Sequence, residues 1–233
     1  MITDPDIIKL NIAISWQNTR TGNVAESLEY ALKAHAGKGA QSASDFTNTR
    51  NIIAGLYQEL GDPDKALAYQ KEEFERAKSN FDSDPENPYH WVDLCLAYMD
   101  LGIVYFQSSL IEDSVDCFSN MYMLVSDHLV ILPESIELKV LKALACEQLG
   151  NIFLRQYLPQ NAYDYCVEYY NLINDLVRQC PDDADIKDKF IVSNIFVGYY
   201  YYLTNEITTA LNYYSAANKA AIELTSTFND NSQ

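Results

Sequence analysis

The stretch from Leu149 to Pro181, LGNIFLRQYLPQNAYDYCVEYYNLINDLVRQCP, decides the fold because it repeats along the chain. A shift back by 48 residues superimposes its small, aromatic and proline positions on residues of the same kind. The columns are Ala54, Gly102, Gly150 and Gly198; Ala66, Ser114, Ala162 and Ala210; Tyr57, Tyr105, Phe153 and Tyr201; and Pro85, Pro133 and Pro181. A fixed period over several copies predicts a repeat array in which each unit packs against its neighbours.

Each column has a physical reason in a pair of packed helices. Two antiparallel helices approach closely only where their side chains are small, which accounts for the two columns of Gly, Ala and Ser. The aromatic residue three positions after the first small residue lies on the same helical face and fills the space beside the contact. Proline cannot donate a helical N–H, so it suits a loop between two helices. The pattern therefore predicts helical hairpins.

This pattern resembles the tetratricopeptide repeat (TPR), in which Leu-Gly is followed by an aromatic, a small residue, a second aromatic and proline. One copy that carries these positions in order is Leu101-Gly102, Tyr105, Ser114, Phe118 and Pro133. Gln70 and Cys166 replace the second aromatic in two copies, and the period exceeds the usual length of about 34 residues, as in a long-helix variant. The resemblance implies an all-α fold, a right-handed α-solenoid of about five antiparallel helical hairpins that form a TPR-like superhelix.

The chain is expected to form a single TPR-like domain over residues 1–233. Residues 1–46 are expected to form a degenerate first hairpin, in which Ser15 is the small position although it breaks the register. Four repeats are expected at 47–94, 95–142, 143–190 and 191–228, before a polar tail at 229–233. Apolar periodicity and turn residues predict helices at 5–19, 24–36, 45–60, 65–80, 89–107, 111–130, 134–156, 160–180, 184–204 and 206–225.

The composition limits the kinds of partner that the chain can bind. It has 233 residues with 16 basic and 33 acidic side chains, for a net charge of −17. Such a surface repels phosphate backbones and attracts basic partners, so nucleic-acid binding is not expected. No signal peptide is visible and the apolar runs are too short to span a bilayer, so no membrane insertion is expected. Five cysteines, without a C-x-x-C pair, predict reduced thiols in a cytoplasmic protein.

No pattern in the sequence indicates catalysis, a cofactor or a metal site. His35, His90 and His128 stand apart from other metal-type ligands at any recognised spacing. The eight glycines form no phosphate-binding loop, and neither G-x-S-x-G nor H-E-x-x-H occurs. Carboxylates are spread over turns and polar helix faces. We therefore expect a protein that is not an enzyme and that has no cofactor and no metal.

A second apolar stripe on the first helices of the later repeats lies opposite the face that packs within the hairpin, where polar residues would be usual. The corresponding positions are Leu96, Met99, Ile103 and Phe106; Leu144, Glu147, Asn151 and Leu154; and Val192, Ile195, Tyr199 and Tyr202. In TPR proteins these positions line the concave groove that holds a partner, so the resemblance implies a partner-binding groove. Ile103, Leu154 and Tyr199 are then expected to be partly exposed. A tightly wound core or a homo-oligomer contact would also explain the stripe.

The expected function is protein–protein interaction, as a cytoplasmic adaptor or regulatory subunit that binds a peptide or helix of a partner in its concave groove. The partner segment is expected to be apolar with basic flanks, because the chain is acidic. Two alternatives remain open, a structural or sensor scaffold subunit of a larger bacterial signalling assembly and a sensor of a peptide or small molecule. Trp16 and Trp91 are expected to be packing residues rather than binding residues.

Overall fold

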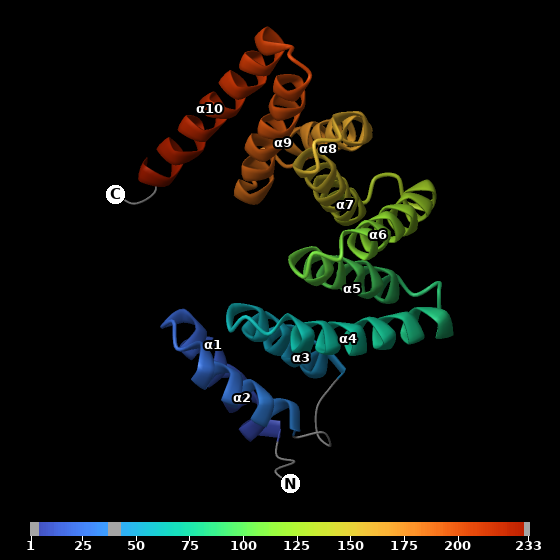
Figure 1. The fold of residues 1–233 in the computed structure, drawn as a ribbon, viewed down its shortest axis with the longest axis vertical. Coiled ribbons are helices and arrows are strands. Elements are labelled where there is room, and N and C mark those ends of the chain that lie inside the picture. Colours follow the sequence, from blue (N-terminus) through green and yellow to red (C-terminus); the bar gives the residue numbers. More distant parts are fainter. Residues whose placement is uncertain (1–4, 37–42, 231–233) are drawn as a thin grey trace. The chain divides into compact units, whose positions relative to one another are not determined.

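The structure, a computed structural model, describes the backbone of residues 5–36 and 43–230 and the side chains of residues 9–36 and 49–226. In these ranges all regular secondary structure is α-helical (Figure 1). The helices are α1 (Pro5–Arg20), α2 (Val24–Ala36), α3 (Ala43–Glu59), α4 (Pro63–Ser83), α5 (Pro88–Gln107), α6 (Ile111–Ile131), α7 (Ile136–Arg155), α8 (Pro159–Gln179), α9 (Ala184–Leu203) and α10 (Ile207–Asp230). The predicted series of helices is therefore confirmed, with small differences at the helix ends.

The last helix extends further than the apolar pattern predicted. Because α10 continues to Asp230, residues 229 and 230 of the expected tail are helical, and residues 231–233 lie outside the described residues. No Gly or Pro occurs between Ile207 and the end of the chain, so the sequence contains no residue that would end the helix earlier.

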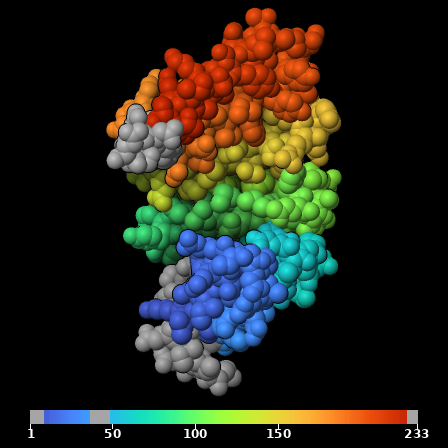
Figure 2. Space-filling model, turned by 90° about the vertical axis from the view of Figure 1, so that its left-hand side faces the viewer, coloured from blue at the N-terminus to red at the C-terminus, as the bar shows by residue number. Residues whose placement is uncertain are grey.

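The helices pack into two compact units, Met1–Cys117 (unit 1) and Phe118–Gln233 (unit 2), with the boundary inside α6. Within each unit consecutive helices pack in chain order (Figure 1), and in unit 1 the first hairpin lies against the second (Figure 2). The helices α5, α7 and α9 begin at positions 48 residues apart. The expected repeat limits fall inside these helices, because the limits were counted from the small column. The loops that join one hairpin to the next lie at 84–87, 132–135 and 180–183.

The turn inside each hairpin contains a residue in the left-handed backbone conformation. In four of these turns the residues are Gly61, Ser109, Tyr157 and Asn205, with φ values between 57° and 74°. The N–H of the following residue donates to a carbonyl oxygen five positions earlier, at 2.8–2.9 Å, and this acceptor belongs to the aromatic column. The bond satisfies a carbonyl oxygen that would otherwise have no hydrogen-bond partner at the end of the helix. The turn therefore ends the first helix of the hairpin and leads the chain into the second helix.

The loops between hairpins contain the proline column, as predicted, and also a regular set of helix caps. The side chain of Asn87 accepts a hydrogen bond from the N–H of Tyr89 at the start of α5, at 3.1 Å. Ser135 and Asp183 cap α7 and α9 in the same way. A side-chain oxygen at this position satisfies one of the free N–H groups of the first helical turn.

The small columns bring the two helices of a hairpin into direct contact. The hydroxyl of Ser114 in α6 donates to the carbonyl oxygen of Gly102 in α5 at 2.8 Å. In the first hairpin the hydroxyl of Ser27 donates to the carbonyl oxygen of Ser15, also at 2.8 Å. Ser15 is therefore the small position of the degenerate first hairpin, as predicted, even though it breaks the register.

The glycines of unit 2 meet different partners from those that the sequence suggested. A Cβ placed on Gly150 would lie 3.2 Å from the Sγ atom of Cys166, and one on Gly198 would lie 2.9 Å from the ring of Tyr214. These partners stand four positions after the small residues Ala162 and Ala210. The second helix therefore comes closest to the glycine one turn after its small residue. This contact lies on the same side of the helix, because residues four apart share a helical face.

A buried ion-pair network joins α3, α4 and α5 in unit 1. The carboxylate of Glu73, which is 2% exposed, accepts hydrogen bonds from Nη1 of Arg50 at 2.9 Å and from Nε of Arg76 at 2.8 Å. Arg76 also donates to both carboxylate oxygens of Asp93, at 2.9 Å each. Because the four residues come from three helices, the network fixes the relative positions of those helices.

All five cysteines are free thiols, namely Cys95, Cys117, Cys146, Cys166 and Cys180. Burial raises the pKa of Cys95 and of Cys166 to about 12, so at neutral pH these thiols are protonated and weakly nucleophilic. Among the helices that the structure describes, none combines the length and the apolar character needed to cross a membrane.

Candidate functional site

The predicted site residues belong to α5 in unit 1 and to α7 and α9 in unit 2, each the first helix of a hairpin. We name the side of these helices on which they lie, together with the matching side of α3 in unit 1, the first-helix face of each unit. Leu96 is 40% exposed, Ile195 is 44% exposed and Tyr202 is 56% exposed. The half-buried members are Met99, Ile103, Phe106, Leu144, Glu147, Asn151, Val192 and Tyr199. The second apolar stripe therefore reaches the surface in both units.

Leu154 is the exception, and the expectation that it is partly exposed is wrong. Its side chain is 2% exposed. It belongs to a core cluster with Ala162 and Cys166 of α8 and with Val197 and Tyr200 of α9. The next hairpin covers this end of α7, so a residue on the predicted face becomes part of the core between hairpins.

Two tyrosines form the exposed aromatic part of this face in unit 2. The rings of Tyr199 and Tyr202 are stacked, with a centroid distance of 6.4 Å and an angle of 15° between their planes. Tyr214 of α10 adjoins them, and its pKa is raised by burial and by the neighbouring Tyr199 and Tyr202. The three rings present apolar surface together with phenolic hydroxyl groups, a combination that suits protein interfaces.

The polar members of the predicted set in unit 2 interact with side chains of the same unit. Burial raises the pKa of the Glu147 carboxyl, while the charge of Lys189 and a hydrogen bond from Tyr169 act in the opposite direction. The side-chain oxygen of Asn151 accepts a hydrogen bond from Nε of Arg155 at 3.0 Å. These two residues therefore place polar groups at the edge of an apolar surface. The polar groups already have hydrogen-bond partners within the unit.

In unit 1 the first-helix face contains a carboxyl group that is not balanced by a cation. The Oδ2 atom of Asp100 in α5 accepts a hydrogen bond from Nδ2 of Asn51 in α3 at 2.9 Å. None of the described Lys, Arg or His side chains forms an ion pair with it. Burial, aided by the charge of Glu73, raises the pKa of Asp100 to about 6. The Oδ1 atom of Asn51 is buried and accepts no hydrogen bond from the described part of the chain.

Two open hollows of unit 1 meet at α3, where Gly55 and Glu59 line both of them. The first has a volume of about 300 Å³ and is lined by apolar side chains that include Trp16, Ile52 and Leu56, with Asn51 at its wall. The second has a volume of about 650 Å³ and extends from α3 to Gln107 of α5. A Cβ on Gly55 would meet no atom within 4 Å. Glycine inside a helix costs about 1 kcal/mol relative to alanine, and here no packing contact requires it.

Replacing Asp100 with asparagine is expected to stabilise the protein at neutral pH. The folded state holds the proton of Asp100 more tightly than the unfolded state, so the contribution of Asp100 to stability falls as pH rises from about 4 to about 6 and then stays constant. Asp100→Asn should therefore raise the free energy of unfolding by about 1–3 kcal/mol at pH 7.5 and have little effect near pH 4. Thermal melts at both pH values measure this, and an equal change in Tm at the two pH values would contradict it.

The two tryptophans differ from each other. Trp91 is 8% exposed and its Nε1 donates to the carbonyl oxygen of Pro85 at 2.7 Å, so its predicted packing role is confirmed. Trp16 was expected to be a packing residue rather than a binding residue, but it is 58% exposed and lines the smaller hollow of unit 1. Gly55 and Asp100 were not predicted from the sequence as site residues. The features that could have indicated them are a glycine inside an apolar helix for Gly55 and an acidic residue beside Leu101-Gly102 for Asp100.

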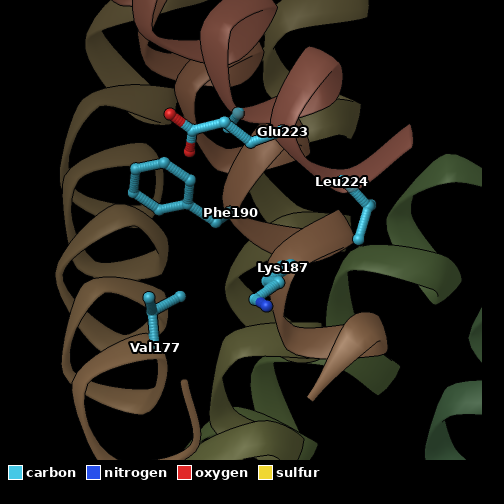
Figure 3. A pocket seen from close by; sticks show the side chains of 6 residues that line it. Val177, Lys187, Phe190, Glu223 and Leu224 are labelled. Atoms are coloured by element: carbon cyan, nitrogen blue, oxygen red, sulfur yellow. The ribbon is translucent and has the colours of Figure 1, made fainter. Parts of the chain in front are cut away.

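A third hollow lies in unit 2, away from the predicted residues. Its volume is about 180 Å³, and it is lined by Val177 of α8, Lys187 and Phe190 of α9, and residues near the end of α10 that include Glu223 and Leu224 (Figure 3). It has the size of one or two side chains. In the described part of the chain, no group of three or more His, Cys, Asp or Glu side chains is placed to hold a metal ion.

No protein-family model and no curated protein matches the chain. Two crystal structures of nearly identical TPR-like repeats from Podosopora anserina do match its structure, with TM-scores of 0.66 and 0.65 at 12% and 11% identity. They cover 95% and 94% of this chain, and the match covers 98% and 96% of theirs. A TPR protein from Thermus thermophilus matches over 96% of this chain and 97% of its own length at 15% identity, with a TM-score of 0.42. At these identities the likeness shows the fold alone, and it confirms the predicted TPR-like array of helical hairpins.

Proposed function

We propose that this chain, which has the fold of TPR proteins, is a non-enzymatic protein–protein interaction module. The first-helix face of either unit would bind a peptide or a helix of a partner protein. The observation that carries the proposal is the exposure of Leu96, Ile195 and Tyr202 on helices whose opposite faces are buried. A few buried anchor residues account for most of the binding energy at protein interfaces, and tyrosine is among the most frequent of them.

The charge of the chain and the shape of its hollows define the partner further. The net charge of −17 favours a segment with basic residues beside its apolar ones, in the setting of a cytoplasmic adaptor or regulatory subunit. The hollows at Gly55 are open to solvent, which suits an extended chain better than an enclosed small molecule. An open face of this kind therefore favours a peptide over the small-molecule alternative.

The test begins with selection of peptides from a random phage-displayed library on the purified protein. Hydrogen–deuterium exchange with a selected synthetic peptide then locates the binding surface. The expected result is slower exchange in α3, α5, α7 or α9, where the first-helix face lies. Failure to select any peptide, or slower exchange confined to α4, α8 or α10, would contradict the proposed function.

A further inference from the structure

Helix α3 passes between the two hollows of unit 1, and two of its residues, Gly55 and Glu59, line both of them. Gly55 lines both hollows, and a Cβ there would meet no atom within 4 Å. By contrast, Gly150 and Gly198 of the small column are closely approached by the next helix, Gly198 by the ring of Tyr214. Since nothing within the described part of the chain crosses Gly55, the position leaves room for a backbone from another molecule.

Polar atoms one turn away from Gly55 give this position a chemical preference. Asn51 lies four residues earlier on α3, and Asp100 of α5 is hydrogen-bonded to it at 2.9 Å. One oxygen of the Asp100 carboxyl receives this bond, and no described cation pairs with the group. The Oδ1 atom of Asn51 is buried without a donor. A carboxylate and an amide oxygen are both acceptors, and the charge of the carboxylate favours a donor that carries positive charge.

We propose that this part of unit 1 binds an arginine side chain of a peptide against Asp100 and Asn51, with the peptide backbone crossing α3 at Gly55. An adjacent apolar side chain of the peptide would enter the hollow lined by Trp16, Ile52 and Leu56. The inference rests on the proposed function and names the class of partner, an extended segment in which arginine stands beside an apolar residue.

Arginine fits better than lysine because its planar guanidinium donates several hydrogen bonds in a fixed fork. Two neighbouring acceptors on different side chains, Asp100 and Asn51, match such a fork. The smaller hollow also contains one charge of each sign, Arg20 and Glu59, so it adds no net preference. The raised pKa of Asp100 agrees with the proposed arginine site. Burial makes the ionised carboxylate unfavourable in the free protein, and a bound cation would offset that cost.

The first experiment pans one random phage-displayed library in parallel on the wild-type protein and on Asp100→Asn. This variant is expected to fold at least as well as the wild type. Wild-type selection should enrich arginine, and Asp100→Asn should lose that enrichment. Synthetic peptides from the wild-type pool should bind tenfold to a hundredfold more weakly when citrulline, a neutral isostere, replaces arginine, and Asp100→Asn should bind both forms equally.

The second experiment fills the meeting point of the hollows. Gly55→Leu adds a side chain into open space and should keep or raise Tm while it weakens the same peptides at least tenfold. Ala68→Leu, an exposed position on α4 of the same hairpin, is the matched control and should leave the Kd unchanged.

The outcomes separate this inference from the proposed function. Peptides that bind to the first-helix face but show no arginine preference, or that bind Gly55→Leu as they bind the wild type, overturn the arginine site and leave the proposed function intact. Failure to select any peptide overturns both. Loss of binding by Gly55→Leu and by citrulline substitution, with Ala68→Leu unaffected, supports the site.

Discussion

Replacing Glu73 with alanine is expected to lower the free energy of unfolding by about 3 kcal/mol or more, which corresponds to a fall in Tm of roughly 6–12 °C for a chain of this size. Glu73 is 2% exposed and accepts charged hydrogen bonds from Arg50 and Arg76. Its removal leaves two largely buried guanidinium groups with less negative charge around them. The effect should be large because the cost of burying a charge remains after its partner is removed.

Thermal and urea melts followed by circular dichroism would measure this change. Glu75→Ala is the matched control, because Glu75 lies on α4 two residues away and is exposed. It should change stability by no more than about 0.5 kcal/mol. Equal melting curves for the two variants would show that the network contributes little to the stability of unit 1.

Replacing Gly198 with leucine is the second change with a large expected effect. The first atom of the new side chain would lie 2.9 Å from Cε1 of Tyr214 and 3.3 Å from Cβ of Tyr213, so the ring of Tyr214 or α10 itself has to move. Overpacking of this kind costs about 1–3 kcal/mol, and more when backbone has to shift. The leucine should therefore lower Tm in thermal melts and weaken the contact between the helices of the last hairpin.

Gly55→Leu provides the control for this change, since the same substitution enters open space on α3. It should keep or raise Tm, because leucine has a higher helix propensity than glycine. A lower Tm for Gly198→Leu and a higher Tm for Gly55→Leu would show that Gly198 permits a helix contact and that Gly55 leaves a surface open. A Gly198→Leu variant that melts at the wild-type temperature would contradict the packing seen at Tyr214.

The fold was accessible from the sequence because its cause is a local and repeated contact. Gly102 and Ser114 stand in one copy where Ser15 and Ser27 stand in another, and the same hydrogen bond joins each pair. The left-handed turn residues also repeat every 48 residues, yet they were not predicted. Gly61 and Asn205 are usual in that conformation, whereas Ser109 and Tyr157 are not, so residue type alone could not reveal the column.

The site could be predicted only in part, because exposure depends on the neighbouring hairpin. Phe106 and Leu154 occupy matching positions 48 residues apart, but α9 covers Leu154 whereas Phe106 stays half-buried. Single-helix periodicity cannot distinguish these cases. Asp100 was missed for the same reason, since its importance comes from burial and from a contact with Asn51 on another helix.

The most direct test of the first-helix face is the Kd of a library-selected peptide for the double variant Leu96→Glu/Tyr202→Glu, measured beside its melting temperature. The control is Tyr89→Glu/Leu211→Glu, which changes residues that are 84% and 61% exposed. A binding face predicts affinity at least tenfold weaker for the first variant, an unchanged Kd for the control, and melting close to wild type for both. Wild-type affinity in the first variant, or its unfolding while the control stays folded, would contradict the binding face.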